Sequence, residues 1–516
     1  MNTPLYVEQL IRYGLKEMLI DENDVHFVRN TLLAMFGLDD PYYGEVPEEL
    51  PALPQILNNL CDDAFAKGLF EHDNVVYRDL FDTKIMGALV ARPSDVVRTF
   101  YALLKEDSKK ATDYFYHLAC ASNYIRTDRI AKNLSWDSQT PYGPLTITVN
   151  LAKPEISPNA VIPKAVKKER PYPRCMLCVE NPGYVGRTDF PARQTLRTIP
   201  LTLSGESWNM QYSPYVYYNE HCIVFSSEHR PMLVNRDTFV RLAEFVDLFP
   251  HYFLGSNAGL PVVGGSILSH DHYQGGNEVL PLEHAKNDWE LTIKQFPGIK
   301  AETIKWPVAT IRAHTKDRGE LVEFCNHVLT TWQNYFNEGV QIKAYSEENG
   351  VKTLHNAITP TLRKTEDGTY TVNLILRNNV TTPEYPAGLY HAHPEHHHIK
   401  KENIGVIEVM GLAILPGRLL QNLDEISDIL CGKTPYEPAE LQKAEHPLNP
   451  HAAWIAFLME KYGSQGCSKA EAKAAVEQEV GVKFSQILGD VSVFKETDSG
   501  KAAFKDYLAA AGFELV

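Results

Sequence analysis

The sequence predicts an α+β protein with mainly antiparallel sheets in its centre and helices at both ends. Residues 136–415 contain repeated strand-like runs rich in β-branched residues, separated by long runs with helical spacing of apolar residues. Residues 1–135 and 416–516 show helical spacing almost throughout. Strands and helices mixed in this way favour antiparallel sheets with helices packed against them.

A chain of 516 residues is too long for one ordinary core, so several units are expected. We expect a helical N-terminal extension at 1–135, two mixed blocks at 136–300 and 301–415, and a helical C-terminal region at 416–516. The strands expected in the mixed blocks lie at 145–151, 196–203, 208–218, 221–225, 261–268, 306–314, 340–345, 369–377 and 404–415. The long helices expected there lie at 237–253 and 317–336, and a Pro- and Lys-containing connector at 154–173.

Composition excludes several classes of protein. A hydrophobic fraction of 44% with no uninterrupted apolar run of about 18 residues predicts no membrane span. The net charge of −15 argues against a nucleic-acid binder but leaves room for a local basic pocket that takes a small anion. Glu8 and Arg12 interrupt the apolar residues near the N-terminus, so no signal peptide is expected. We therefore expect a cytoplasmic location.

The most informative segment is residues 264–276, where an apolar run leads into His270, His272 and Gln274 between two glycine pairs. In an extended segment, residues two apart face the same side, so these three side chains are expected to project together. Two imidazoles and an amide beside glycine-rich backbone suit phosphoryl or nucleotidyl chemistry, because phosphate can approach such backbone closely.

His272 is the candidate nucleophile of this segment. A neutral imidazole can attack phosphorus and divide one transfer into two steps. Gln274 can donate its amide to a phosphate oxygen, and it suits a leaving group that needs no protonation, such as a sugar phosphate. The alternative is a structural histidine, which most lone histidines on strands are. Asn257, in an Asn-Ala-Gly turn, is a candidate for binding the ligand, although an ordinary turn is an equal alternative.

Cys175 and Cys178 form the only close pair among eight scattered cysteines. The Cys-x-x-Cys spacing lets two thiolates bind one tetrahedral metal, and His229 and His270 would complete a Cys₂His₂ set typical of structural zinc. Two ordinary buried cysteines or a redox pair are the alternatives. The long intervals between the four residues exclude a zinc finger, and the sparse cysteines exclude a disulfide framework.

A second histidine run lies at residues 391–398. His391 and His393 repeat the His-x-His spacing of the first block, which suggests duplication and a possible second metal. A solvated loop rich in histidine is an equal alternative.

These motifs resemble a known family. The Cys-x-x-Cys pair, the Glu-His-Arg-Pro loop at 228–231 and the Gly-Gly-Ser-x-x-Ser-His-Asp-His-Tyr-Gln-Gly-Gly run at 264–276 resemble galactose-1-phosphate uridylyltransferases of the class II bacterial form. That family belongs to the histidine-triad superfamily. The resemblance implies two related histidine-triad-like halves with antiparallel sheets, and often a homodimer. The departures from the class I pattern are Asp271 and Tyr273, which replace proline and glycine.

The resemblance implies a ping-pong exchange in which UDP-glucose gives its uridylyl group to a histidine and galactose 1-phosphate then takes it. His272 matches that histidine, and Gln274 the glutamine that holds the phosphoryl oxygens. The four Cys and His residues above match zinc ligands, and His391, His393 and His355 match a second, iron-binding site. A carboxylate is also expected after the signature, and Glu283 and Asp288 are both near it.

Two rival functions remain open at this stage. The first rival, also an enzyme, is another histidine-triad activity, such as a dinucleotide phosphorylase or a nucleotide hydrolase. A hydrolase of this superfamily usually has histidine at the position of Gln274, so the glutamine favours transfer to a phosphate acceptor. The other rival is a zinc-containing nucleotide sensor without turnover, which the presence of His272 disfavours.

Overall fold

The computed structural model describes residues 2–151, 172–265, 267–463 and 466–516. The chain divides into two compact units. The first unit comprises 1–132, 154–216 and 220–229, and the second comprises 133–153, 217–219 and 230–516. The expected connector at 154–173 lies almost wholly outside the described residues, and the expected boundaries near residues 135, 300 and 415 stay a prediction.

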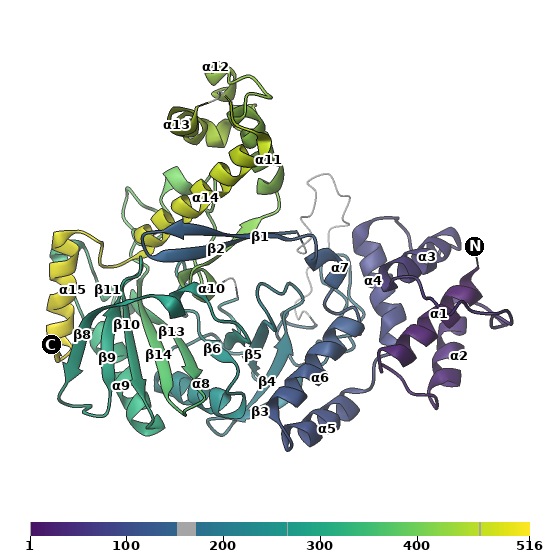
Figure 1. Ribbon diagram of the computed structural model, residues 1–516. Coiled ribbons are helices and arrows are strands. Elements are labelled where there is room, and N and C mark those ends of the chain that lie inside the picture. The colour runs from purple at the N-terminus through teal and green to yellow at the C-terminus, as the bar shows by residue number, and fades with distance from the viewer. Residues whose placement is uncertain (1, 152–171, 266, 464–465) are drawn as a thin grey trace. The chain divides into compact units, whose positions relative to one another are not determined.

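The first unit begins with the expected helical extension (Figure 1). Its helices are α1 (Thr3–Lys16), α2 (Val25–Phe36), α3 (Leu53–Ala66), α4 (Val75–Gly87), α5 (Pro93–Leu104), α6 (Ser108–Ala121) and α7 (Thr127–Ile130). Local chemistry sets their ends: the Asn74 side chain accepts the first free backbone N–H groups of α4, and Pro93 occupies the first turn of α5. Across the described ranges, no helix is both long and apolar enough to cross a membrane.

The same unit contains three antiparallel strands, β3 (Ile199–Leu203), β4 (Glu206–Tyr212) and β5 (Cys222–Ser226). Ser204 and Gly205 join β3 to β4, and both have positive φ, at 52° and 73°. A two-residue turn of this kind matches the right-handed twist of its strands. Three expected strands, at 196–203, 208–218 and 221–225, therefore exist with slightly different ends.

In the main sheet of the second unit, eight strands follow the order β16-β8-β9-β10-β14-β13-β6-β7, and every recorded neighbouring pair is antiparallel. They are β6 (Phe253–Gly255), β7 (His272–Gly276), β8 (Asn287–Ile293), β9 (Lys300–Ile304), β10 (Thr310–Thr315), β13 (Asn356–Lys364), β14 (Tyr370–Asn378) and β16 (Phe513–Leu515). The expected α+β class with mainly antiparallel sheets is confirmed.

Helices α8 (Arg236–Leu248) and α9 (Arg318–Trp332) lie side by side against this sheet (Figure 1). The indole Nε1 of Trp332, at the end of α9, lies 3.0 Å from the carbonyl oxygens of Ala357 in β13 and Arg377 in β14. A fully buried indole N–H needs such acceptors, and here they fix the helix to two neighbouring strands. A short hairpin, β11 (Tyr345–Glu348) and β12 (Val351–Leu354), follows α9.

A smaller sheet has the order β1-β2-β15, formed by β1 (Leu134–Thr140), β2 (Gly143–Asn150) and β15 (Leu412–Pro416). Helix α14 (Lys469–Val491) packs across it, and Gly481 permits the approach because a Cβ there would collide with Ser138. The remaining helices are α10 (Val406–Val409), α11 (Leu419–Leu430), α12 (Pro438–Leu441), α13 (Ala452–Tyr462) and α15 (Asp498–Ala510).

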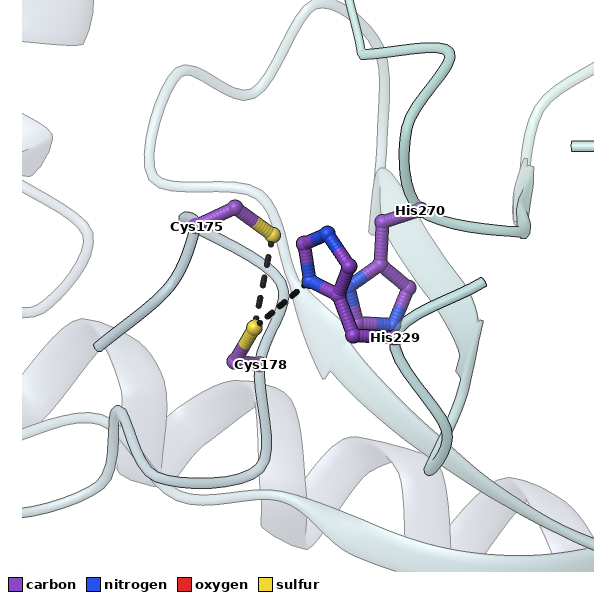
Figure 2. A group of neighbouring side chains, drawn as sticks. All are labelled: Cys175, Cys178, His229 and His270. Carbon is purple, nitrogen blue, oxygen red and sulfur yellow. Dashed lines mark hydrogen bonds between the residues drawn. The ribbon is translucent and has the colours of Figure 1, made fainter. Parts of the chain in front are cut away.

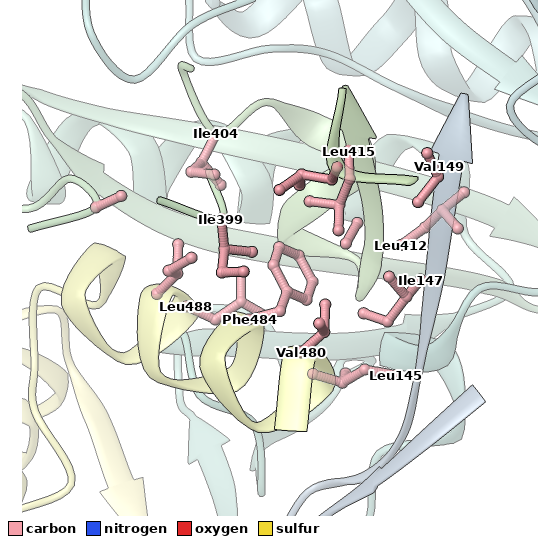
Figure 3. Close-up of a cluster of buried hydrophobic side chains, with 14 of the residues drawn as sticks. Leu145, Ile147, Val149, Ile399, Ile404, Leu412, Leu415, Val480, Phe484 and Leu488 are labelled. Carbon is pink, nitrogen blue, oxygen red and sulfur yellow. The ribbon is translucent and has the colours of Figure 1, made fainter. Parts of the chain in front are cut away.

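An extended apolar cluster of the second unit includes the side chains between this sheet and α14 (Figure 3). Leu145, Ile147 and Val149 project from alternate positions of β2, and Val480 and Phe484 project from α14. All five are fully buried. Their spacing of two in the strand and four in the helix puts each set on one face of its element.

Three expected strands are wrong. The described residues within 261–268 form no strand: residues 261–263 form a turn, and Val262 has a φ of 73° that no strand accommodates. In the range 340–345, Val340 ends a short 3₁₀ helix and Gln341 has a left-handed φ of 60°, so the extended backbone begins only at Tyr345. Within 404–415, Glu408 accepts the N–H of Gly405 and starts the short helix α10, so only the end of that range pairs as β15.

Replacing Phe484 with alanine should lower the free energy of unfolding by about 3–5 kcal/mol, because the change leaves a cavity among the aliphatic side chains of β2 and α14. Equilibrium urea unfolding measures this loss. Phe457→Ala is the matched control, since Phe457 is 44% exposed on α13. Equal effects of the two changes would contradict the placement of the core.

Candidate active site and metal centre

Cys175 and Cys178 lie in a tight turn of the first unit. The N–H of Cys178 donates to the carbonyl of Cys175 at 3.3 Å, and the N–H of Leu177 donates to Cys175 Sγ at 3.4 Å. The two sulfur atoms are 3.5 Å apart, and Cys178 Sγ lies 3.1 Å from Nδ1 of His229. The Cys-x-x-Cys spacing therefore brings both thiols to one point beside an imidazole.

His270 completes the group predicted from the sequence (Figure 2). One ligand atom from each of Cys175, Cys178, His229 and His270 lies within 4.8 Å of all the others. Figure 2 shows the sulfur atoms and the two rings turned toward one another. Within the described ranges, this is the one group of three or more Cys, His, Asp or Glu side chains close enough to hold a metal ion.

The buried Cys178 thiol would ionise only beside a cation. Burial, together with the neighbouring Cys175 sulfur, raises the pKa of the Cys178 thiol to about 12. A thiol in this environment becomes a thiolate only if a positive charge compensates it. Two sulfur and two imidazole donors supply a complete four-coordinate set, which fits a structural metal ion.

The signature segment forms a strand only from His272 onward, as β7. Gln274 pairs with Gly255 of β6, and Gly275 pairs with Leu254. A Cβ at Gly275 would collide with the carbonyl oxygen of Phe253, so glycine is required for the strands to meet. His272 and Gln274 occupy alternate positions of β7 and share a face, as expected, while His270 precedes the strand.

His272 is held in one tautomer. Its Nδ1 lies 2.7 Å from the carbonyl oxygen of His270, and a carbonyl can only accept, so Nδ1 carries the proton. The remaining nitrogen, Nε2, therefore keeps its lone pair. The side chain is 5% exposed, and burial lowers the pKa of His272 to about 4, which leaves the ring neutral near pH 7.

Asp271 faces away from this chemistry, as its position between His270 and His272 predicts. Its N–H donates to the carbonyl of Arg230 at 2.7 Å, and its carboxylate lies 3.3 Å from Nε of Arg230. Arg230 directly follows His229. The contact between Asp271 and Arg230 therefore joins the segment that carries His272 to the residue that follows His229.

Asn257 is buried, at 2% exposure, two residues after the end of β6. Its Oδ1 accepts the backbone N–H of Val406 at 2.9 Å, which fixes the orientation of the amide because that N–H can only donate. The Nδ2 atom lies 2.6 Å from the position that a Cβ at Gly265 would occupy. The amide donor therefore faces the bare backbone of the signature segment.

The carboxylate expected after the signature is not resolved by position alone. Glu283 forms an ion pair with Arg363, with Oε2 2.6 Å from Nε, and accepts the N–H of Leu280. Asp288 is exposed near the start of β8. The Glu283 carboxylate therefore serves the fold. No hydrogen bond or ion pair of the Asp288 side chain is found among the described residues.

The second histidine run does not assemble as a metal cluster in the described part of the chain. His355 is engaged by Asn379 and Ser346, at 2.8 and 3.0 Å. His393 stacks on Tyr385 and its Nδ1 lies 3.5 Å from Asp490. His391 is 3% exposed, and burial lowers its pKa. The His-x-His spacing is shared with the first block, but the surroundings of the rings differ.

Sequence reasoning missed the groups that orient these residues. The carbonyl of His270, the N–H of Val406 and the side chain of Asn181, which lies beside the cysteines, all act through hydrogen bonds. Of these groups, only the Asn181 side chain is visible in the sequence, as an amide three residues after Cys178. The backbone partners leave none, because any residue type supplies them.

A neutral histidine with a fixed tautomer, beside glycine-rich backbone, meets the chemical requirements of a transferase that acts through a nucleophilic histidine. The chain matches the family description "Galactose-1-phosphate uridyl transferase, N-terminal domain" over residues 18–231 and the corresponding C-terminal domain over 244–444. The chain belongs to the galactose-1-phosphate uridylyltransferase family.

Curated relatives agree over the whole length. The galactose-1-phosphate uridylyltransferase of Caldanaerobacter subterraneus subsp. tengcongensis is 49% identical over 99% of each chain. Those of Fusobacterium nucleatum and Bacillus subtilis are 44% and 42% identical, with 98% and 99% of this chain covered, and 98% of each relative.

Replacing Cys175 with serine should remove most of the bound metal and lower the melting temperature, because three ligands hold a metal less tightly than four. Elemental analysis of the purified protein measures the metal, and thermal unfolding measures the stability. Cys431→Ser is the control, since Cys431 is half-buried and lies outside the group. Unchanged metal in the Cys175 variant would contradict the assignment.

Proposed function

We propose that the protein exchanges a uridylyl group between UDP-glucose and galactose 1-phosphate through a covalent uridylyl-histidine at His272. The observation that carries the proposal is the 2.7 Å hydrogen bond from His272 Nδ1 to the His270 carbonyl, which leaves Nε2 as the nucleophile. Family membership supplies the identity of the two sugar phosphates. The protein is accordingly a nucleotidyltransferase of galactose metabolism, in the Leloir pathway.

In the first step, His272 Nε2 attacks the α-phosphorus of UDP-glucose. The P–N bond forms as the bond from phosphorus to the bridging oxygen breaks, and glucose 1-phosphate leaves with the electron pair. A phosphate monoester has a second pKa near 6, so this leaving group needs no proton from the protein near pH 7. The Nδ1 proton stays in place, and the His270 carbonyl stabilises the positive charge that the ring acquires.

In the second step, a phosphate oxygen of galactose 1-phosphate attacks the same phosphorus. The P–N bond breaks, UDP-galactose leaves, and His272 returns to its neutral form. We propose that the Gln274 amide and Asn257 Nδ2 donate to the nonbridging oxygens in both steps. The shared face of His272 and Gln274 and the orientation of the Asn257 amide support these roles.

We propose zinc as the metal of the Cys175, Cys178, His229 and His270 group. Tetrahedral zinc, with bonds of about 2.3 Å to sulfur and about 2.0 Å to nitrogen, places sulfur atoms about 3.8 Å apart and sulfur and nitrogen about 3.5 Å apart. The separations of 3.5 and 3.1 Å in this chain are close to those values. Zinc there would supply a structural cross-link that steadies the segment leading into His272.

Further parts of the proposal rest on the sequence and the family resemblance. We propose a cytoplasmic homodimer without a nucleic-acid partner, in line with the net charge of −15. The second metal expected near His391 and His393 is not part of the proposal, because the described residues there form no metal-binding group. Another histidine-triad nucleotidyltransferase or phosphorylase is the alternative activity, and a sensor without turnover is the alternative from another class.

Incubation of the protein with UDP-glucose alone should add the mass of one UMP, and galactose 1-phosphate should remove it. His272→Ala should show no adduct and should lose exchange activity by a factor of about 10⁴ or more, since no other group replaces the nucleophile. Intact-mass spectrometry and a coupled exchange assay make the measurements. Full turnover by this variant, or no adduct on the wild type when binding of UDP-glucose is demonstrated, would overturn the proposal.

Replacing Gln274 with histidine should divert the intermediate toward water, because an imidazole can move protons during hydrolysis and an amide cannot. We expect release of UMP without acceptor to rise by roughly tenfold or more, while exchange falls. Quenched-flow analysis of the isolated uridylyl-enzyme gives both rates. Gln211→His on β4 is the control for adding a buried histidine to a strand, and equal hydrolysis in both variants would refute the role of Gln274.

A further inference from the structure

We propose that Asn181 is a positioning residue of the metal centre, whose side-chain amide locks the Cys-x-x-Cys turn in the form that binds metal. The inference rests on the metal site proposed above and adds a residue that holds no metal itself. Asn181 is fully buried and lies three residues after Cys178.

The Asn181 amide bridges the backbone of both cysteines. Its Nδ2 donates to the carbonyl of Cys175 at 2.9 Å and to the carbonyl of Cys178 at 2.8 Å. Both partners can only accept hydrogen bonds, so the amide nitrogen must face them. The two donors of one side chain are thus both spent on the two peptide groups that carry the metal-binding thiols.

Backbone hydrogen bonds run parallel to those of the side chain. The N–H of Cys178 donates to Cys175 and the N–H of Asn181 donates to Cys178, at 3.3 and 3.1 Å. Each cysteine carbonyl therefore accepts one backbone donor and one donor from the Asn181 amide. The second donor holds each peptide plane at a fixed angle, and the peptide plane sets the direction of the Cα–Cβ bond and of the sulfur.

The other end of the same amide explains why asparagine, and no simpler residue, fits the position. Asn181 Oδ1 is buried and has no hydrogen-bond partner among the described residues. A buried acceptor without a partner destabilises a fold, so the side chain is useful only through its NH₂ group. Aspartate has the same shape but would place acceptors against two carbonyls.

The consequence concerns the metal more than the fold. A turn that is already closed loses little conformational entropy when the metal binds, and it resists the opening of one thiolate that begins metal release. Loss of the bridge should therefore speed metal release and loosen the coordination geometry, even where the protein stays folded.

The chain offers a matched control in the second unit. Asn356 is also fully buried, and its Nδ2 bridges two carbonyls, of Trp332 at 2.7 Å and Tyr335 at 3.0 Å. It lies in β13, outside the metal group. Asn356→Asp therefore removes the same kind of bridge without touching the cysteine turn.

The experiment compares full-length wild type, Asn181→Asp, Asn181→Ala and Asn356→Asp. Each protein is loaded with zinc, and release to a chromogenic chelator is timed under native conditions. Each is also loaded with cobalt(II), whose visible bands report tetrahedral thiolate coordination. We expect both Asn181 variants to release zinc roughly tenfold faster or more and to show altered cobalt bands, while Asn356→Asp matches the wild type.

The outcomes separate this inference from the proposal beneath it. Equal release from the Asn181 and Asn356 variants, or wild-type rates and bands in the Asn181 variants, would overturn the positioning role alone. A wild type that binds neither zinc nor cobalt would overturn the metal site together with this inference. The alanine variant removes the unpartnered Oδ1 as well, so it keeps the test decisive if the aspartate variant does not fold.

Discussion

The site depends on one hydrogen bond, from Nδ1 of His272 to the carbonyl of His270. It fixes the tautomer, so the nitrogen with the free lone pair is Nε2. The ring of the same His270 belongs to the metal group, so one residue contributes a ligand through its side chain and an acceptor through its backbone. A metal that bound the His270 ring would also fix that carbonyl, and it would thereby couple the metal group to the proposed nucleophile without touching the substrate.

Packing around β7 serves the same end. Gly275 lets the backbone of β6 come close. The fully buried Tyr273 lies on the face of β7 opposite His272. Burial raises the pKa of the Tyr273 hydroxyl and lowers that of His272, because in both cases the charged form is disfavoured. A nucleophilic imidazole benefits from this environment, since it must stay unprotonated, whereas the buried Cys178 thiol needs a cation to ionise.

The sequence predicted residues whose spacing or donor type carries the chemistry. Cys175 and Cys178 followed from their spacing, and the common face of His272 and Gln274 followed from alternation in a strand. It predicted a strand at 261–268 wrongly, because the apolar residues there lie in a turn and a loop, and Val263 is buried by packing and not by strand pairing. Val263 packs with Ala258 and Ala357, and the positive φ of Val262 breaks the extended backbone. Hydrophobicity alone does not distinguish these two origins of burial.

Asn257 shows why fold and site cannot be separated fully in this protein. Its Oδ1 accepts the first N–H of α10, and its Nδ2 faces the glycines of the signature segment. A substitution that spares the hydrogen bond to Val406, such as aspartate, keeps the helix attached but presents an anion where a phosphate would approach. No natural residue of the size of asparagine keeps the Nδ2 donor while removing only the Oδ1 acceptor. The residue is therefore constrained from both sides, and its amide is the one group that satisfies the fold and the proposed ligand at once.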